Sequence, residues 1–134
     1  MAEFQLQILS PDKVLFDGKA ENLIVRTTVG DKGFLANHEP YVAALGVGRL
    51  KVKQDGEFRS AAVSSGIVRF RDNKAQILAQ SVEWKDEIDV TRAEAAKERA
   101  EQELQQELSD KELDMTEFDL KRALNRINVV KFDY

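Results

Sequence analysis

The sequence predicts a β + α chain, in which an N-terminal antiparallel β-sandwich of about ten strands at residues 1–84 precedes a C-terminal α-helical hairpin at residues 85–134. Apolar residues recur at about every second position in the first part and at about every 3.6 positions in the second. Turn-forming residues interrupt the first part at short intervals, whereas no Gly or Pro occurs from Ser81 to Tyr134. With 134 residues and 43% hydrophobic content, the chain is long enough for one core and a small appendage.

The strands of the first part are expected to be short. From Glu3 to Ser10, apolar residues alternate with glutamines as in a half-buried strand, and Pro11-Asp12 ends the run. Asp55-Gly56 predicts a tight hairpin, because this pair tolerates the positive φ angles that such turns require. No connection is long enough to contain a helix, so all neighbouring strands should be antiparallel. Further strands are expected at residues 14–16, 22–29, 34–36, 41–47, 50–53, 61–64, 67–70 and 75–80, with breaks at Ser65-Gly66 and Asp72-Asn73.

Two helices are expected in the second part. The first begins near Asp89 or Thr91, either of which is suited to cap it, and presents a narrow stripe of mostly small apolar residues. Ser109-Asp110 and the charged residues beyond predict a turn. A second helix is expected from about Thr116, where Asp119 three residues later completes a weak capping box.

Composition excludes several classes of function. A net charge of -4 and an isoelectric point near 5.1 argue against nucleic-acid binding. The absence of Cys and the single His exclude thiol chemistry and the commoner zinc sites, and no metal site is expected. Neither a phosphate-binding loop nor a catalytic pair is present, so we expect a non-catalytic protein. No apolar run of 18 residues occurs, so we expect no insertion into a membrane.

The arginines of the two predicted helices suggest an anion site. Asp89, Arg92, Ala96 and Arg99 are spaced to share one helix face, and the pair Arg122 and Arg126 follows at i and i+4 on the second helix. In a hairpin these four guanidiniums meet at one end, where they match a polyphosphate, and a carboxylate beside them can accept a bond from an amino group such as that of adenine.

A purely structural interpretation of the same residues stays open. In this interpretation Asp89 serves only as a helix cap, since a carboxylate is favoured at a helix N-terminus. Arg99 is placed to pair with Glu103, and Arg122 is placed to pair with Asp119.

Four stretches read together resemble the epsilon subunit of bacterial F-type ATP synthases. They are Gly30-Asp31-Lys32-Gly33-Phe34-Leu35 with His38-x-Pro40, then Val63-Ser64-Ser65-Gly66, then Ile77-Leu78-Ala79, and finally Ile88-Asp89-Val90-Thr91-Arg92-Ala93. The resemblance covers nearly the whole chain in order, spacing and length. It implies a ten-stranded sandwich followed by a helical hairpin, the architecture that the periodicity predicts independently.

The resemblance also implies a regulatory and structural role in the rotor, at the cytoplasmic face of the cell membrane. The sandwich would contact the gamma subunit and the membrane c-ring, with Asp31 and His38 as c-ring contacts. The extended hairpin would reach the alpha and beta subunits and block ATP hydrolysis. The folded hairpin would bind ATP as a regulatory ligand, with or without Mg²⁺, and the alternative is a structural rotor linker that binds no nucleotide. The implied ATP-binding residues are Glu83, Ile88, Asp89, Arg92, Ala93, Arg99, Arg122 and Arg126.

Overall fold

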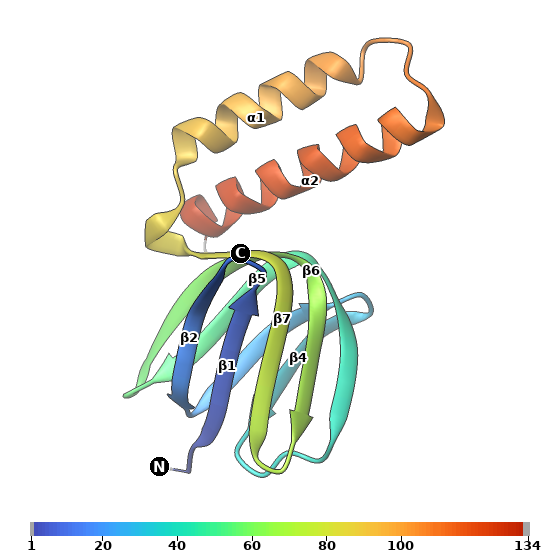
Figure 1. Cartoon of the computed structure of the whole chain (residues 1–134). Coiled ribbons are helices and arrows are strands. Elements are labelled where there is room, and N and C mark those ends of the chain that lie inside the picture. Colours follow the sequence, from blue (N-terminus) through green and yellow to red (C-terminus); the bar gives the residue numbers. More distant parts are fainter. Residues whose placement is uncertain (1, 133–134) are drawn as a thin grey trace.

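The computed structural model describes residues 2–132 and contains a β-sandwich with a helical hairpin lying across one end (Figure 1). The last two residues of the predicted helical hairpin, 133–134, lie outside the described residues. The elements in chain order are β1 (Phe4–Ser10), β2 (Lys13–Ala20), β3 (Asn22–Thr27), β4 (Gly30–Leu35), β5 (Tyr41–Gln54), β6 (Glu57–Arg71), β7 (Lys74–Trp84), the 3₁₀ turn η1 (Lys85–Glu87), α1 (Val90–Glu103) and α2 (Asp110–Phe132).

The strands form one sheet in the order β2-β1-β7-β6-β5-β3-β4, which folds over to enclose the core. All neighbouring pairs are antiparallel except β1 and β7, which are parallel from Gln5 opposite Lys74 to Leu9 opposite Leu78. The expectation of an entirely antiparallel sheet was therefore wrong at this pair. Five intervening strands make the crossover between β1 and β7, so no helix is needed for it.

The described residues form seven strands, fewer than the ten or so expected, because two long strands continue through positions that the sequence marks as breaks. β5 continues through Gly46 and Gly48, and β6 continues through Ser65-Gly66. The register of β6 against β7 is the same before and after this point, although Ser65 adopts a positive φ of 44°. Position 66 has no room for a side chain, because a Cβ atom there would lie 2.2 Å from the backbone oxygen of Leu78. These glycines therefore lie within the strands and do not end them.

The sandwich core consists of the alternating apolar residues of the strands. Phe34 and Phe70 stack with ring centroids 5.6 Å apart, and Phe4 meets Phe70 edge to face at 5.4 Å. The predicted hairpin at Asp55-Gly56 is confirmed, with φ angles of 52° and 81°. The largest fully buried side chains of this core are those of Phe4, Phe34, Phe70, Leu6, Ile8, Leu23, Leu50, Ile77, Val25, Val52 and Val68.

The two helices begin at side-chain caps. Asp89 caps α1, because its carboxylate accepts a bond from the backbone N–H of Arg92 at 3.0 Å. α2 begins earlier than predicted, at Asp110, so the charged residues from 110 to 115 are helical. The Ser109 hydroxyl accepts from the N–H of Glu112 at 3.2 Å, and the Ser109 N–H donates to the Glu112 carboxylate at 3.4 Å. This capping box displaces the weaker one expected at Thr116, whose hydroxyl instead donates to Glu103.

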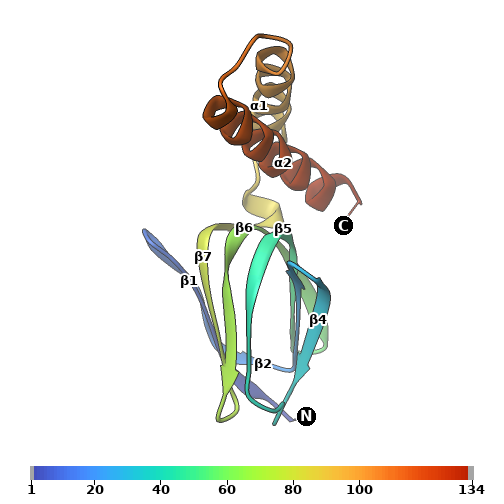
Figure 2. The ribbon, with the colours of Figure 1, turned by 90° about the vertical axis from the view of Figure 1, so that its right-hand side faces the viewer.

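The hairpin packs on the sandwich through α2, and both views of the ribbon show this helix next to the strands (Figure 1 and Figure 2). Val129 is fully buried against Ala62 of β6 and Ile88 of the connecting segment. Beside this contact, the Asn125 amide donates to the backbone oxygens of Gly48 at 3.0 Å and of Val63 at 3.4 Å. A small apolar cluster and one side-chain amide therefore join α2 to strands β5 and β6 and to the connecting segment.

Candidate functional site

A cavity of about 290 Å³ lies where the end of β7, the start of α1 and the middle of α2 meet. The sandwich contributes one acidic residue from its last strand, α1 contributes one face of its first three turns, and α2 contributes two arginines. The lining residues are Glu83, Glu87, Asp89, Arg92, Ala93, Ala96, Arg99, Arg122 and Arg126.

The first helix supplies a carboxylate, two guanidiniums and two small side chains to this cavity. Asp89 is fixed by its capping bond, Arg92 follows it about one turn later, and Arg99 lies two turns beyond Arg92 on the same face. Ala93 is buried, and Ala96 keeps the floor between the arginines shallow. The predicted sharing of one face by Asp89, Arg92, Ala96 and Arg99 is thus confirmed.

The second helix places Arg122 and Arg126 on the opposite wall. The Arg126 Nε donates to the Glu83 carboxylate, and both side chains are about one quarter exposed, at 28% and 27%. The Arg122 Nε is buried and has no hydrogen-bond partner within the described residues. Its guanidinium carbon lies 5.7 Å from the centroid of the Phe118 ring. A buried N–H donor without a partner costs free energy unless a ligand or water satisfies it.

The cavity continues between the helices as a second hollow of about 250 Å³. Ala96, Arg99, Arg122 and Arg126 line both spaces, so the two adjoin along one set of guanidiniums. The floor of the second hollow consists of small side chains, as the predicted alanine stripe requires. It is lined by Ala96, Arg99, Ala100, Glu103, Asp119, Arg122, Ala123 and Arg126.

The carboxylates that line the cavity are already bonded within the protein, whereas most of its guanidinium groups are not paired with a carboxylate of the described residues. Its three carboxylates are engaged: Glu83 by Arg126, Glu87 by the backbone N–H of Trp84, and Asp89 by its helix cap. Over residues 2–132, neither Arg92 nor Arg99 forms an ion pair. The alternative pairs Arg99 with Glu103 and Arg122 with Asp119 do not form among these residues either. A polyanion would therefore meet three guanidiniums that no carboxylate occupies.

Seven of the eight residues predicted to bind ATP line this one cavity. Ile88 does not line it, because its side chain is buried in the contact with Ala62 and Val129. Glu87 and Ala96 were not among the predicted site residues. Their signals were present in the sequence, since Glu87 belongs to the acidic start of the helix and Ala96 lies one turn before Arg99 on the arginine face.

The two predicted c-ring contacts lie apart, at opposite ends of β4. Asp31, beside the β3–β4 turn, pairs with Arg26 at 2.9 Å, and this hydrogen bond lowers the pKa of its carboxyl group. His38 follows the other end of the strand, where its ring packs edge to face on Phe34 at 4.9 Å. The neighbouring Asn37 N–H donates to the Asn73 side chain at 2.7 Å, which ties this loop to the β6–β7 turn. The structure does not bring Asp31 and His38 into one site.

Residues 2–132 hold neither a membrane-spanning helix nor a metal-binding cluster. No helix in this range has the length and apolar character to cross a membrane. No group of three or more acidic or histidine side chains in the same range is arranged to hold a metal ion.

Comparisons with known proteins agree with the architecture along the whole chain. Residues 3–85 match the model of the ATP synthase delta/epsilon chain β-sandwich domain, and residues 86–131 match that of the long α-helix domain of the same chain. A solved structure of the mitochondrial ATP synthase of Euglena gracilis contains a chain that superposes with a TM-score of 0.81 at 23% identity, over 93% of this chain and 79% of that one. That likeness supports the fold.

Relatives of similar length are much closer in sequence. A protein of Ruminococcus albus named ATP synthase epsilon chain is 50% identical over 130 residues, which is 96% of this chain and 97% of the relative. Another of the same name, from Caldicellulosiruptor bescii, is 44% identical over 131 residues, with 98% and 96% covered. The resemblance found in the sequence motifs is thereby confirmed, and the chain belongs to the ATP synthase delta/epsilon chain family.

Proposed function

We propose that this chain is a non-catalytic, regulatory and structural subunit of the rotor of an F-type ATP synthase, whose folded helical hairpin binds ATP. In this function the sandwich links the gamma subunit to the c-ring, at the cytoplasmic face of the cell membrane. The hairpin, when released, extends to the alpha and beta subunits and blocks ATP hydrolysis. ATP is an effector here and is not consumed.

The observation that carries the ATP-binding proposal is the unpartnered Nε of Arg122 in a cavity lined by seven predicted site residues. A phosphate oxygen would satisfy this donor with a charge-assisted bond, which contributes about 1.5–3 kcal/mol. Arg92 and Arg99 provide further hydrogen-bond donors to the same polyphosphate, because a guanidinium group can bind two phosphate oxygens at once.

The position of the cavity supports a regulatory effect of the ligand. Its walls belong to three elements, since Glu83 lies on β7, Arg92 and Arg99 lie on α1, and Arg122 and Arg126 lie on α2. A ligand that contacts all three holds the hairpin closed and docked on the sandwich. It stabilises the folded arrangement and shifts the population away from released helices.

Titration of the full chain with ATP and with AMP, followed by calorimetry, tests this function. We expect ATP to bind at least about tenfold more tightly than AMP, because AMP lacks the two phosphates that the additional guanidiniums would contact. The same titration with and without Mg²⁺ determines whether the ion accompanies the nucleotide. Equal affinity for ATP and AMP would contradict the arginine cavity as a polyphosphate site.

The second candidate function is a structural rotor linker without nucleotide binding. It is favoured by the two contacts that already use site residues, the Asp89 cap and the ion pair of Arg126 with Glu83. Under this alternative ATP gives no heat of binding at millimolar concentration. The substitution Arg92→Ala then leaves the titration result unchanged. The titration therefore separates the two functions.

A further inference from the structure

The backbone pairing between β6 and β7 ends where the chain leaves the sandwich for the hairpin. The last pair of this ladder is Ala61 opposite Trp84, and the connecting segment begins at the next residue (Figure 1). Arg59 lies two residues beyond that end on β6, so it shares the face of Ala61 and is a diagonal neighbour of Trp84. A side chain at this position can hold the departing chain after the backbone bonds stop.

The guanidinium of Arg59 contacts two residues of the departing chain. Its central carbon lies 3.8 Å from the centroid of the Trp84 ring, well inside the range of about 6 Å for cation–π contacts. Its Nη2 lies 3.8 Å from the carboxylate of Asp86. Arg59 therefore holds the chain on both sides of Lys85, at the last residue of β7 and in the η1 turn.

The contact with the ring is the stronger of the two. Trp84 is 4% exposed, and Phe16 approaches its ring edge to face with centroids 6.3 Å apart. A cation over a desolvated ring is held more tightly than one over an exposed ring. The side chains of Arg59 and Asp86 are 55% and 77% exposed, so water screens their ion pair and the pair contributes little by itself. The indole thus anchors the guanidinium, and Asp86 orients it.

The departing chain has two sides, and Arg59 lies on the side opposite to the arginine cavity. One side supplies Glu83, Glu87 and Asp89 to that cavity. The other side borders a separate hollow of about 400 Å³, which is lined by Phe58, Arg59, Ser60, Lys85, Asp86 and Val130. The same segment is therefore a wall of the arginine cavity and, on its other side, the surface that Arg59 holds.

Trp84 connects these two sides. Its backbone N–H donates to the Glu87 carboxylate at 3.2 Å, so the residue that Arg59 covers also orients an acid of the cavity wall. Asp89 follows two residues later and caps α1. The path of the connecting segment therefore determines where α1 begins, and with it the position of the arginines that α1 carries.

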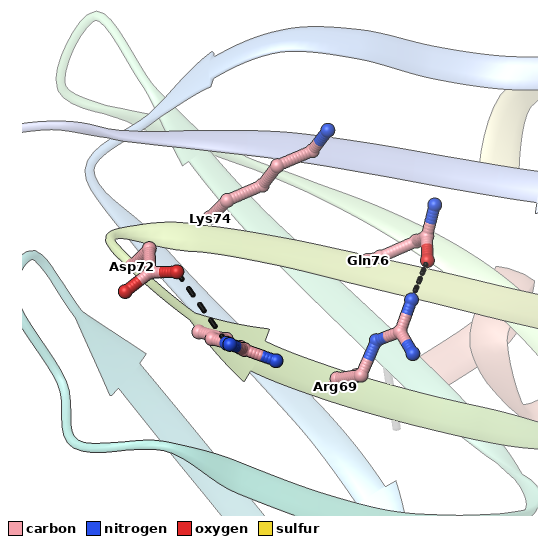
Figure 3. Close-up of a pocket in the computed structure, with 5 residues that line it drawn as sticks. Arg69, Asp72, Lys74 and Gln76 are labelled. Atoms are coloured by element: carbon pink, nitrogen blue, oxygen red, sulfur yellow. Dashed lines mark hydrogen bonds and ion pairs between the residues drawn. The ribbon is translucent and has the colours of Figure 1, made fainter.

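The arginines at the other end of β6 bond within the sheet. Arg69 donates to Gln76 of β7 at 2.8 Å, and Arg71 pairs with Asp72 at 3.4 Å, around a hollow beside the β6–β7 turn (Figure 3). This turn lies at the end of the sandwich away from the helices (Figure 1). Arg69 is therefore a matched control for Arg59, because it is the same residue type on the same strand with a side-chain partner on β7.

We propose that Arg59 is a positioning residue for the arginine cavity. It stacks on Trp84 and pairs with Asp86, and it thereby holds the connecting segment in the path that places Glu87 and Asp89 in the cavity wall. The inference rests on the proposed binding of ATP to this cavity, and it adds a residue that acts on nucleotide affinity from outside the cavity.

Calorimetric titration of the full chain with ATP at physiological salt measures the effect on the cavity. Arg59→Ala should weaken ATP binding by at least about fivefold, because the released segment samples paths that do not complete the wall. Arg59→Lys keeps the charge but lacks the planar guanidinium, so it should weaken binding by at least about threefold. Arg69→Ala should bind ATP within about twofold of the unmodified chain, because its charge is screened at that distance.

The fluorescence of Trp84 gives a second readout, because this is the only tryptophan in the sequence. Without nucleotide, acrylamide should quench it at least about twofold more strongly in Arg59→Ala than in Arg69→Ala, because the ring loses its cover. Saturating ATP should reverse this difference, since the nucleotide then holds the segment from the other side. A residue that only stabilised the sandwich would lower the melting temperature without changing the ATP affinity or giving this recovery.

The outcomes separate this inference from the proposed function. If the unmodified chain binds no ATP, the proposed function is contradicted and the inference falls with it. If the unmodified chain binds ATP and both Arg59 variants bind within about twofold of it, the function stands and the positioning role is overturned. Full binding by Arg59→Lys beside loss in Arg59→Ala would also overturn it, because charge alone would then explain the effect. Hydrogen exchange of the sandwich strands verifies folding, and if Arg59→Ala does not fold, Arg59→Lys decides the result.

Discussion

Replacing Asn125 by aspartate should detach the helical hairpin from the sandwich. The Asn125 amide donates to the backbone oxygens of Gly48 at 3.0 Å and Val63 at 3.4 Å, and it is the polar link between α2 and strands β5 and β6. Asn125→Asp keeps the size of the side chain, removes both N–H donors, and places a carboxylate against two carbonyl groups. The change therefore acts on this contact and leaves the packing of Val129 in place.

The size of the effect follows from these two contacts. A neutral hydrogen bond contributes about 1 kcal/mol net, and leaving buried polar groups unsatisfied costs about 1–3 kcal/mol. We expect a total of about 2 kcal/mol or more, which shifts the docking equilibrium about 30-fold toward the released hairpin. Two helices of this length are only marginally stable once they are released, because most helical stability comes from tertiary packing.

Native-state hydrogen exchange measures this shift segment by segment. Amides of residues 90–132 should lose protection by about tenfold or more, while those of the sandwich strands stay as they were. Asn128→Asp is the control, because it adds the same charge to the same helix and Asn128 makes no comparable bond within the described residues. Equal loss of protection in both variants, or none in either, would refute the assignment of Asn125 as the link.

Three other substitutions have defined outcomes. Arg122→Ala should weaken ATP binding by at least about tenfold in calorimetry while the melting temperature is kept, whereas Lys121→Ala should bind normally; equal affinities would exclude the unpartnered guanidinium as a ligand. Gly66→Ala should lower the free energy of unfolding by about 1–3 kcal/mol in urea, because its Cβ would contact a backbone oxygen at 2.2 Å, while Gly46→Ala, with open space around it, should not. Folding lowers the pKa of Asp31 from its usual 3.8, so the stability that its ion pair provides is complete above that pH and is lost as the pH falls through the lowered pKa. Asp31→Asn should thus be less stable than the unmodified chain by about 1 kcal/mol or less at pH 7, and the two should converge in thermal melts as the pH falls below the lowered pKa of Asp31.

The local features of the fold were predictable from the sequence. Asp55-Gly56 determines a hairpin through its own φ preferences, and Asp89 caps a helix through an atom three residues away. The arginine face of α1 follows from helical spacing alone. Each of these signals lies within a few residues, where periodicity and turn chemistry decide the structure.

Features that depend on distant residues were not predictable in this way. The parallel pairing of β1 with β7 depends on how the whole sheet folds over. Gly66 has the sequence pattern of a strand break, whereas the structure shows that a neighbouring backbone oxygen leaves no room for a side chain there. The start of α2 was misjudged because two possible capping boxes occur in the sequence, and the one at Ser109 is the box that forms. For the site, spacing placed the arginines together, but the engagement of Arg126 by Glu83, 43 residues earlier, required the structure.

The contacts that dock the hairpin and those that line the arginine cavity belong to the same stretch of α2. Asn125 links this helix to the sandwich, while Arg122 and Arg126, within one turn of it, face the cavity. Under the proposed function, ATP at a hundredfold excess over its Kd stabilises the arrangement that it binds by about 2.7 kcal/mol. That is as large as the cost estimated for losing the Asn125 link, so the ligand and the link contribute comparably to the same equilibrium. Under this function, a hairpin held by one amide, one ion pair and a small apolar cluster is weak enough for a nucleotide to control, and a larger apolar interface would have placed it beyond that control.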